Sequence, residues 1–85
     1  MYYLYIVRCA DSSLYTGITV DVDRRIAEHN GVGGARYTRA RGPVRLVYQK
    51  KFRNRSSASK EEARIKKLSR DEKLEIIKNN KKSRR

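Results

Sequence analysis

The strongest constraint on the fold lies near the start of the sequence, where residues 2–7 are all aromatic or aliphatic. Such a run, rich in tyrosine and β-branched side chains, predicts a strand over residues 2–9. Residues 10–13, Ala-Asp-Ser-Ser, have the composition of a turn, and a second strand is expected over residues 14–18. The chain therefore begins with an antiparallel hairpin.

A helix and a third strand are expected next. The helix covers residues 22–30, with Asp21 or Asp23 as its N-terminal cap and Gly31 as its end. The strand covers residues 44–52, where apolar and polar side chains alternate except at Val47.

The C-terminal third of the chain is helical in pattern. One helix is expected over residues 56–68, and Ser69 and Glu72 have the spacing of a capping box that starts another. This order of elements predicts an α+β fold, a small three-stranded antiparallel sheet flanked by helices. We expect one domain over residues 1–78 and a basic, frayed tail over residues 79–85.

Composition limits the chain to one core. It has 85 residues, of which 38% are hydrophobic, and Cys9 is its only cysteine, so no intramolecular disulfide can form. The apolar run before Arg8 is too short for a signal peptide or a membrane span. We therefore expect a cytoplasmic protein, associated at most with the bacterial nucleoid and not secreted.

The net charge points to the kind of partner. With 22 Lys and Arg against 9 Asp and Glu, the formal charge is +13, far more than solubility requires. A polyanion is the expected partner, nucleic acid first and an anionic membrane surface a distant alternative. The basic residues are spread along the chain without a broad aromatic face, which argues against a membrane.

The small number of histidines and cysteines excludes several enzyme classes. One His and one Cys cannot form a zinc cluster of the usual spacing, and the sequence has neither a phosphate-binding GxxxxGK loop nor a Ser/His/Asp set. What remains is a group of tyrosines, an Arg and a His on one helix, a few carboxylates and a large positive charge.

Arg25 and His29 are four residues apart, so their side chains rise from one face of the predicted helix. They either converge on a bound group or form an ordinary surface pair. Tyr5 shares a strand face with Tyr3 and Val7, where packing in the core is the simpler interpretation. Gly17 inside a strand predicts a bulge or the close approach of another group.

Two neighbouring carboxylates, Glu61 and Glu62, lie on the predicted helix that carries Ala58 and Ile65. At least one of them must border the buried stripe, where a charge needs a partner. That partner is either an arginine or a divalent cation whose shell is completed by water and a substrate phosphate.

These residues together carry a resemblance. In order along the chain stand Tyr5-Ile6-Val7, Tyr15-Thr16-Gly17, Arg25, His29 and Glu62. The sequence resembles the GIY-YIG nuclease superfamily over residues 2–77, in particular its small bacterial members of an uncharacterised protein family. It is also similar to the nuclease domain of eukaryotic endonucleases that cut branched DNA.

The resemblance implies a metal-dependent endonuclease that acts on DNA, with structure-specific cleavage in repair or recombination as the finer expectation. Tyr15 or Tyr5 would help to deprotonate the attacking water, Arg25 would hold the scissile phosphate, and His29 would assist proton transfer or positioning. Glu62 would hold one Mg²⁺ or Mn²⁺ ion, and Gly17 would keep the strand close to the site. Tyrosine has an ordinary pKa near 10, so either tyrosine needs the metal and Arg25 nearby to act as a base.

The chain departs from the family pattern in three places. The first motif lacks the glycine of the family name, as in the small bacterial members, and Ala63 stands where relatives have an aromatic residue. The asparagine that many members carry after the metal-binding glutamate has no counterpart, because Asn79 and Asn80 lie too far along the chain.

Contacts to nucleic acid are expected from basic and aromatic residues outside this motif. The candidates are Arg36, Tyr37, Arg39, Arg41, Arg53 and Arg55. A partner protein required for activity is compatible with so small a chain. The alternative to an enzyme is a non-catalytic nucleic-acid-binding module with the same fold.

Overall fold

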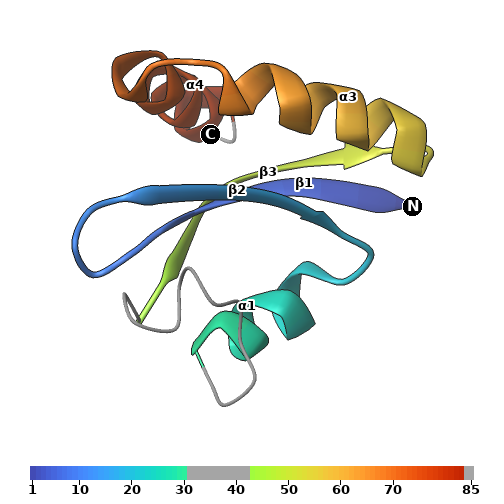
Figure 1. The fold of residues 1–85 in the computed structure, drawn as a ribbon, viewed down its shortest axis with the longest axis horizontal. Coiled ribbons are helices and arrows are strands. Elements are labelled where there is room, and N and C mark those ends of the chain that lie inside the picture. The colour runs from blue at the N-terminus through green and yellow to red at the C-terminus, as the bar shows by residue number, and fades with distance from the viewer. Residues whose placement is uncertain (31–42, 84–85) are drawn as a thin grey trace.

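The computed structural model describes residues 1–30 and 43–83 and has three layers (Figure 1). A three-stranded antiparallel sheet of order β2-β1-β3 lies in the middle, with α1 on one face and α3 and α4 on the other. The elements are β1 (Tyr2–Arg8), β2 (Leu14–Thr19), α1 (Val22–Asn30), β3 (Arg45–Phe52), α3 (Arg55–Lys66) and α4 (Arg70–Ser83). The expected α+β fold is confirmed.

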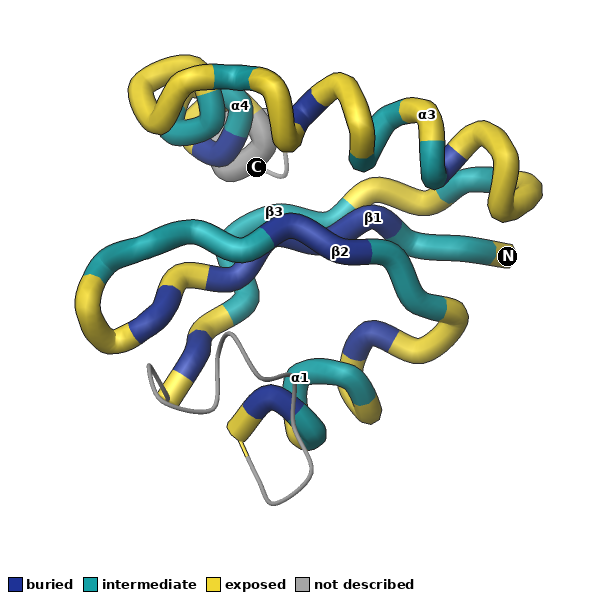
Figure 2. The backbone as a smooth tube through the Cα atoms, in the orientation of Figure 1, coloured by how far each residue is buried: buried dark blue, intermediate teal, exposed yellow. Residues whose placement is uncertain are grey.

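The central position of β1 explains its uninterrupted apolar sequence. Its residues 4–7 are at most 1% exposed, because helices cover both faces of the sheet (Figure 2). Leu4 and Ile6 pack in one core cluster with Ile65 of α3 and Ile77 of α4. On the opposite face, Tyr5, Val7, Cys9 and Val44 form a second cluster, against which Tyr15, Ile26 and Leu46 pack.

A β-bulge in β3 accounts for the interrupted alternation at Val47. Ile6 pairs with Tyr48 and Val7 pairs with Leu46, so Val47 has no partner on β1. Leu46 packs in the cluster on the α1 side, whereas Val47 and Tyr48 both pack in the cluster under α3 and α4. The extra residue therefore places two successive side chains on one face, which a regular strand cannot do.

Side-chain caps begin the helices. An oxygen of Asp21 accepts a hydrogen bond from the backbone of α1 at 3.0 Å, which selects Asp21 over Asp23 as its cap. Ser69 and Glu72 form the expected reciprocal capping box of α4, at 2.9 and 3.2 Å. The cap of α3 is Asn54, which the sequence interpretation missed, and α3 accordingly begins before residue 56.

The last helix is longer than expected. α4 continues to Ser83, past residue 78 where we placed the end of the folded domain. In the part of the chain that the structure describes, no helix combines the length and the apolar character needed to cross a lipid bilayer.

Candidate active site

The site is built around a contact between the two strands of the hairpin. Tyr5 on β1 lies directly opposite Gly17 on β2. A Cβ atom added at Gly17 would lie 2.6 Å from the Tyr5 hydroxyl oxygen and 2.8 Å from its Cζ atom. The close approach expected at Gly17 is confirmed, and the approaching group is the Tyr5 ring, which occupies the space of the missing side chain.

Helix α1 brings His29 to the same place. The Tyr5 hydroxyl lies 2.9 Å from His29 Nε2, and each residue is only 1% exposed. The Tyr15 ring completes the cluster, with its centroid 5.3 Å from that of His29 in an edge-on arrangement and 6.4 Å from that of Tyr5. His29 is therefore a buried member of the tyrosine cluster and not a surface residue near the end of a helix.

Burial decides the protonation of this pair. It is the largest cause that raises the pKa of the Tyr5 hydroxyl above its ordinary value, and a hydrogen bond from Arg25 lowers that pKa in part. Burial also lowers the pKa of His29, and the positive charge of Arg25 lowers it further. At neutral pH a protonated Tyr5 can therefore donate to Nε2 of a neutral His29 while accepting from Arg25.

Arg25 lies where the buried cluster meets solvent. Its side chain is 31% exposed, and Nη1 donates to a carboxylate oxygen of Glu28 at 2.9 Å. The bond to Glu28 is the largest cause that raises the pKa of Arg25, followed by the bond to Tyr5. The role of Glu28 was missed, although the spacing of three residues on a helix would have indicated it.

The two carboxylates of α3 have different surroundings. Glu61 accepts two hydrogen bonds from Arg64 at 2.9 and 2.6 Å, and these bonds are the largest cause that lowers the pKa of Glu61. Lys50 of β3 also lowers the Glu61 pKa, and Glu61 contributes to the raised pKa of Tyr48. Glu61 therefore belongs to the β3 side of the helix.

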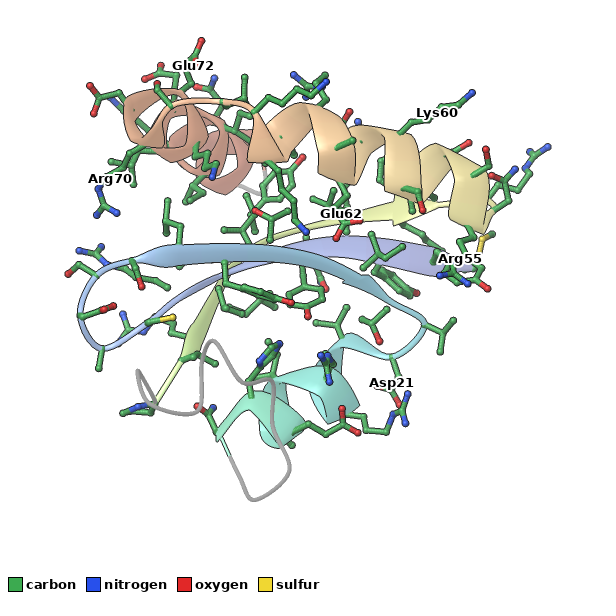
Figure 3. The ribbon with its side chains drawn as sticks, in the orientation of Figure 1. Asp21, Arg55, Lys60, Glu62, Arg70 and Glu72 are labelled. Atoms are coloured by element: carbon green, nitrogen blue, oxygen red, sulfur yellow. The ribbon has the colours of Figure 1, made fainter. Side chains whose placement is uncertain are left out.

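Glu62 follows one position further around α3, on the other side of the buried Ala58–Ile65 stripe. Helical geometry thus directs it to the β2 side, and Figure 3 shows it between α3 and the sheet. Its negative charge is among the smaller causes that raise the pKa of Tyr5, after burial. Glu62 belongs to α3, which covers the opposite face of the sheet from α1, so its charge reaches Tyr5 only as a small electrostatic effect. Its ion-pair partner is Lys66 at 3.2 Å, whereas the arginine expected beside one of the two carboxylates is Arg64, which pairs with Glu61.

Glu62 is the candidate ligand for a hard divalent cation. Within residues 1–30 and 43–83, no three His, Cys, Asp or Glu side chains gather closely enough to hold a metal ion by themselves. Mg²⁺ commonly takes one or two carboxylates and completes its shell with water and substrate phosphates. Thr16, on the α3 face of β2, has a buried hydroxyl with no hydrogen-bond partner among the described residues, as expected where water or a ligand binds.

The candidate nucleic-acid contacts are placed only in part. Arg53 and Arg55 are exposed where β3 ends and α3 begins. Four further candidates, Arg36, Tyr37, Arg39 and Arg41, lie outside the described residues.

The fold is shared with a known family of nuclease domains. The sequence model of the GIY-YIG catalytic domain matches residues 1–75. The chain belongs to the GIY-YIG family, a family of nucleases that act on nucleic acid.

Its relatives are proteins of the uncharacterised UPF0213 group. A UPF0213 protein of Staphylococcus saprophyticus is 51% identical over 76 residues, which cover 89% of this chain and 93% of the relative. The solution NMR structure of a UPF0213 protein from Bacillus halodurans matches at 47% identity with a TM-score of 0.60, over 92% of this chain and 84% of that chain. A second NMR structure, from E. faecalis, matches at 42% identity and a TM-score of 0.64, over 92% and 83%.

Proposed function

We propose that the protein is a metal-dependent endonuclease that hydrolyses phosphodiester bonds in DNA and acts on branched structures in repair or recombination. The observation that carries the proposal is the buried contact between the Tyr5 hydroxyl and His29 Nε2 at 2.9 Å, packed against Tyr15, with Arg25 beside it lowering the pKa of Tyr5. These groups, together with Glu62, come from β1, β2, α1 and α3, so packing of helices on both faces of the sheet is needed to assemble them.

Arg25 binds the scissile phosphate in this proposal. A guanidinium offers forked donors that match two phosphate oxygens, and its charge opposes the charge that develops in the transition state. Glu28 and Tyr5 hold Arg25 from the protein side, while about a third of the side chain stays open to solvent. Arg25 is thus oriented before the substrate arrives.

Exposure separates the roles of the two tyrosines. Tyr5 and His29 are each 1% exposed, so we assign them to positioning Arg25 and fixing α1 against the sheet. Tyr15 is half-buried and can meet a water molecule, which makes it the better candidate to accept the proton of the attacking water. The raised pKa of Tyr5 supports this division, because burial opposes formation of its phenolate.

Glu62 would hold the Mg²⁺ or Mn²⁺ ion. Such an ion supplies charge neutralisation at the phosphate and lowers the pKa of bound water. Lys66 would have to release Glu62 when the cation binds.

The substrate class follows from the size of the protein. A chain of 85 residues has little surface for reading base edges, and most contacts of a basic protein go to the backbone. Recognition of DNA shape is therefore the proposed basis of specificity.

Cleavage of a labelled panel tests the proposal, with linear duplex, splayed-arm, flap and four-way-junction DNA and RNA counterparts, in Mg²⁺, Mn²⁺ or EDTA. Arg25→Gln should lose at least about 100-fold in rate, in the range found when a transition-state donor is removed. Arg24→Gln is the matched control, because Arg24 is the adjacent residue, also pairs with Glu28 and is 60% exposed. Equal rates for the two variants would contradict the assigned role of Arg25.

The alternative function is a nucleic-acid-binding module without catalysis. The ion pair between Lys66 and Glu62 favours it, because a neutralised carboxylate is a weaker cation ligand. This alternative predicts tight binding of the same panel with no cleavage in either metal.

A further inference from the structure

A concave surface lies at the end of the sheet beyond Tyr15. It is a hollow of about 480 Å³, formed where the end of β1 and the turn after it meet the start of β3. Arg8, Ser12 and Arg45 are among its lining residues. It contains none of the groups assigned above to catalysis, and neither arginine was among the candidate contacts.

The two arginines form an unfavourable pair in the protein alone. Arg8 on β1 and Arg45 on β3 are direct cross-strand partners, and both are exposed. Like charges placed opposite each other on neighbouring strands destabilise a sheet. Among the described residues no carboxylate forms an ion pair with either one, and Arg8 Nη2 donates a hydrogen bond to the Ser12 hydroxyl at 3.3 Å.

We propose that Arg8, Arg45 and Ser12 bind a backbone phosphate of the nucleic acid, at a site separate from the scissile phosphate. Two guanidinium groups and a hydroxyl around a hollow supply the donors that a phosphate accepts. The anion would also remove the repulsion between the arginines. The identity of this ligand as nucleic acid rests on the proposed function.

The position of the hollow suits a strand that passes the active site. Arg8 pairs with Leu14, next to the pair of Val7 and Tyr15. Arg8 follows Tyr5 by three residues, which is roughly 10 Å along a strand, so its side chain leaves the end of the sheet on the face opposite to Tyr5. Three nucleotide steps advance about 10 Å along the axis of a duplex, so one DNA strand that passes the end of the sheet is long enough to reach both places.

Binding measured in EDTA tests the site independently of cleavage. We compare an Arg8→Gln, Arg45→Gln double variant with a Lys60→Gln, Lys67→Gln control that removes the same charge from exposed positions of the helical layer. Figure 3 shows Lys60 on the side of α3 away from the sheet. Fluorescence anisotropy with a labelled duplex, over a series of salt concentrations, gives the affinity and its salt dependence.

The proposal predicts that the arginine double variant loses on the order of tenfold in affinity and that its salt slope falls by about one. The Lys60→Gln, Lys67→Gln control should lose clearly less affinity. The melting temperature of the arginine variant should equal or exceed that of the wild type, because repulsion is removed. Equal affinities and slopes for the two double variants would overturn the proposal.

A second measurement distinguishes the source of the phosphate. Backbone NMR signals of Arg8, Ser12 and Arg45 should shift when the duplex is added. A shift with inorganic phosphate and none with the duplex would overturn the assignment to nucleic acid. If the wild type fails to cleave in Mg²⁺ while the arginine variant still loses affinity, the catalytic proposal fails and the phosphate site stands.

Discussion

Gly17 is the position at which the site has the least room for change. Substitution by alanine would place Cβ 2.6 Å from the Tyr5 hydroxyl, and the ring cannot retreat easily because Tyr5 is buried and bonded to His29. We expect Gly17→Ala to lower the free energy of unfolding by about 1–3 kcal/mol, the usual cost of overpacking. Urea denaturation measures this change.

A double-mutant cycle with Tyr5→Phe tests the cause. The hydroxyl oxygen is the nearest atom to the new methyl group, so its removal should reduce the cost of Gly17→Ala without abolishing it, because Cζ remains at 2.8 Å. An identical cost in both backgrounds would show that the strain arises elsewhere.

Titration of His29 should make the free energy of unfolding depend on pH. The chain has one histidine, and burial holds its pKa below the ordinary value of 6.5. Below pH 6.5 the unfolded chain binds a proton that folded His29 does not, so the free energy of unfolding should fall as the pH falls from 6.5 toward the lowered pKa. Above pH 6.5 this contribution is complete.

The control for this effect is His29→Gln, which removes the titrating group. Unfolding free energies measured between pH 5 and 8 should decline on acidification in the wild type and stay nearly level in the variant. Glu61 titrates separately at lower pH, because its pKa is also lowered by Arg64. Parallel pH profiles would rule out His29 as the source.

At the scale of elements, the capping box of α4 is the clearest local device. Ser69→Ala removes one of its two reciprocal hydrogen bonds at the start of the helix that carries Ile77 into the core. We expect a loss of about 1 kcal/mol in unfolding free energy, typical of a lost N-cap. Ser56→Ala, exposed inside the first turn of α3, should change stability by less than about 0.5 kcal/mol. Equal losses would contradict the capping role.

The order of elements could be predicted because each has a local signal. The aromatic and aliphatic run at the start of the chain predicted β1, and the capping-box spacing of Ser69 and Glu72 predicted the start of α4. The bulge at Val47 could be noticed but not explained, because it depends on pairing with a distant strand. The cap Asn54 was not predicted, because the apolar residues with helical spacing begin only at Ala58 and do not mark the first turn of α3.

The sequence named the candidate site residues but not the contacts between them. The resemblance named Tyr5, Arg25 and His29, but the burial of His29 against Tyr5 arises from packing α1 on the sheet. From helical spacing alone, Glu61 and Glu62 were equally good candidates for the carboxylate beside the buried stripe. Only the packing of α3 on the sheet shows that they have different neighbours. The contacts of these side chains therefore depend on long-range packing, which the local spacing of residues does not reveal.

At the scale of the whole molecule, the charge of +13 predicts binding that depends strongly on salt. If about five cations meet phosphates, the logarithm of the affinity should fall with a slope of about −4.5 against the logarithm of salt concentration. Anisotropy titrations with a labelled duplex measure this slope. A slope near zero would show that the charge does not serve nucleic-acid binding.

Glu62 offers the most direct test of the nuclease proposal, because Glu61 is its neighbour on the same helix with the same side chain. We would measure initial cleavage rates of Glu62→Gln and Glu61→Gln beside the wild type, in Mg²⁺ and in EDTA, together with DNA affinity in EDTA. The account predicts that Glu62→Gln loses metal-dependent cleavage while keeping its affinity, and that Glu61→Gln still cuts. Cleavage by Glu62→Gln at the wild-type rate, or no metal-dependent cleavage by the wild type, would contradict it.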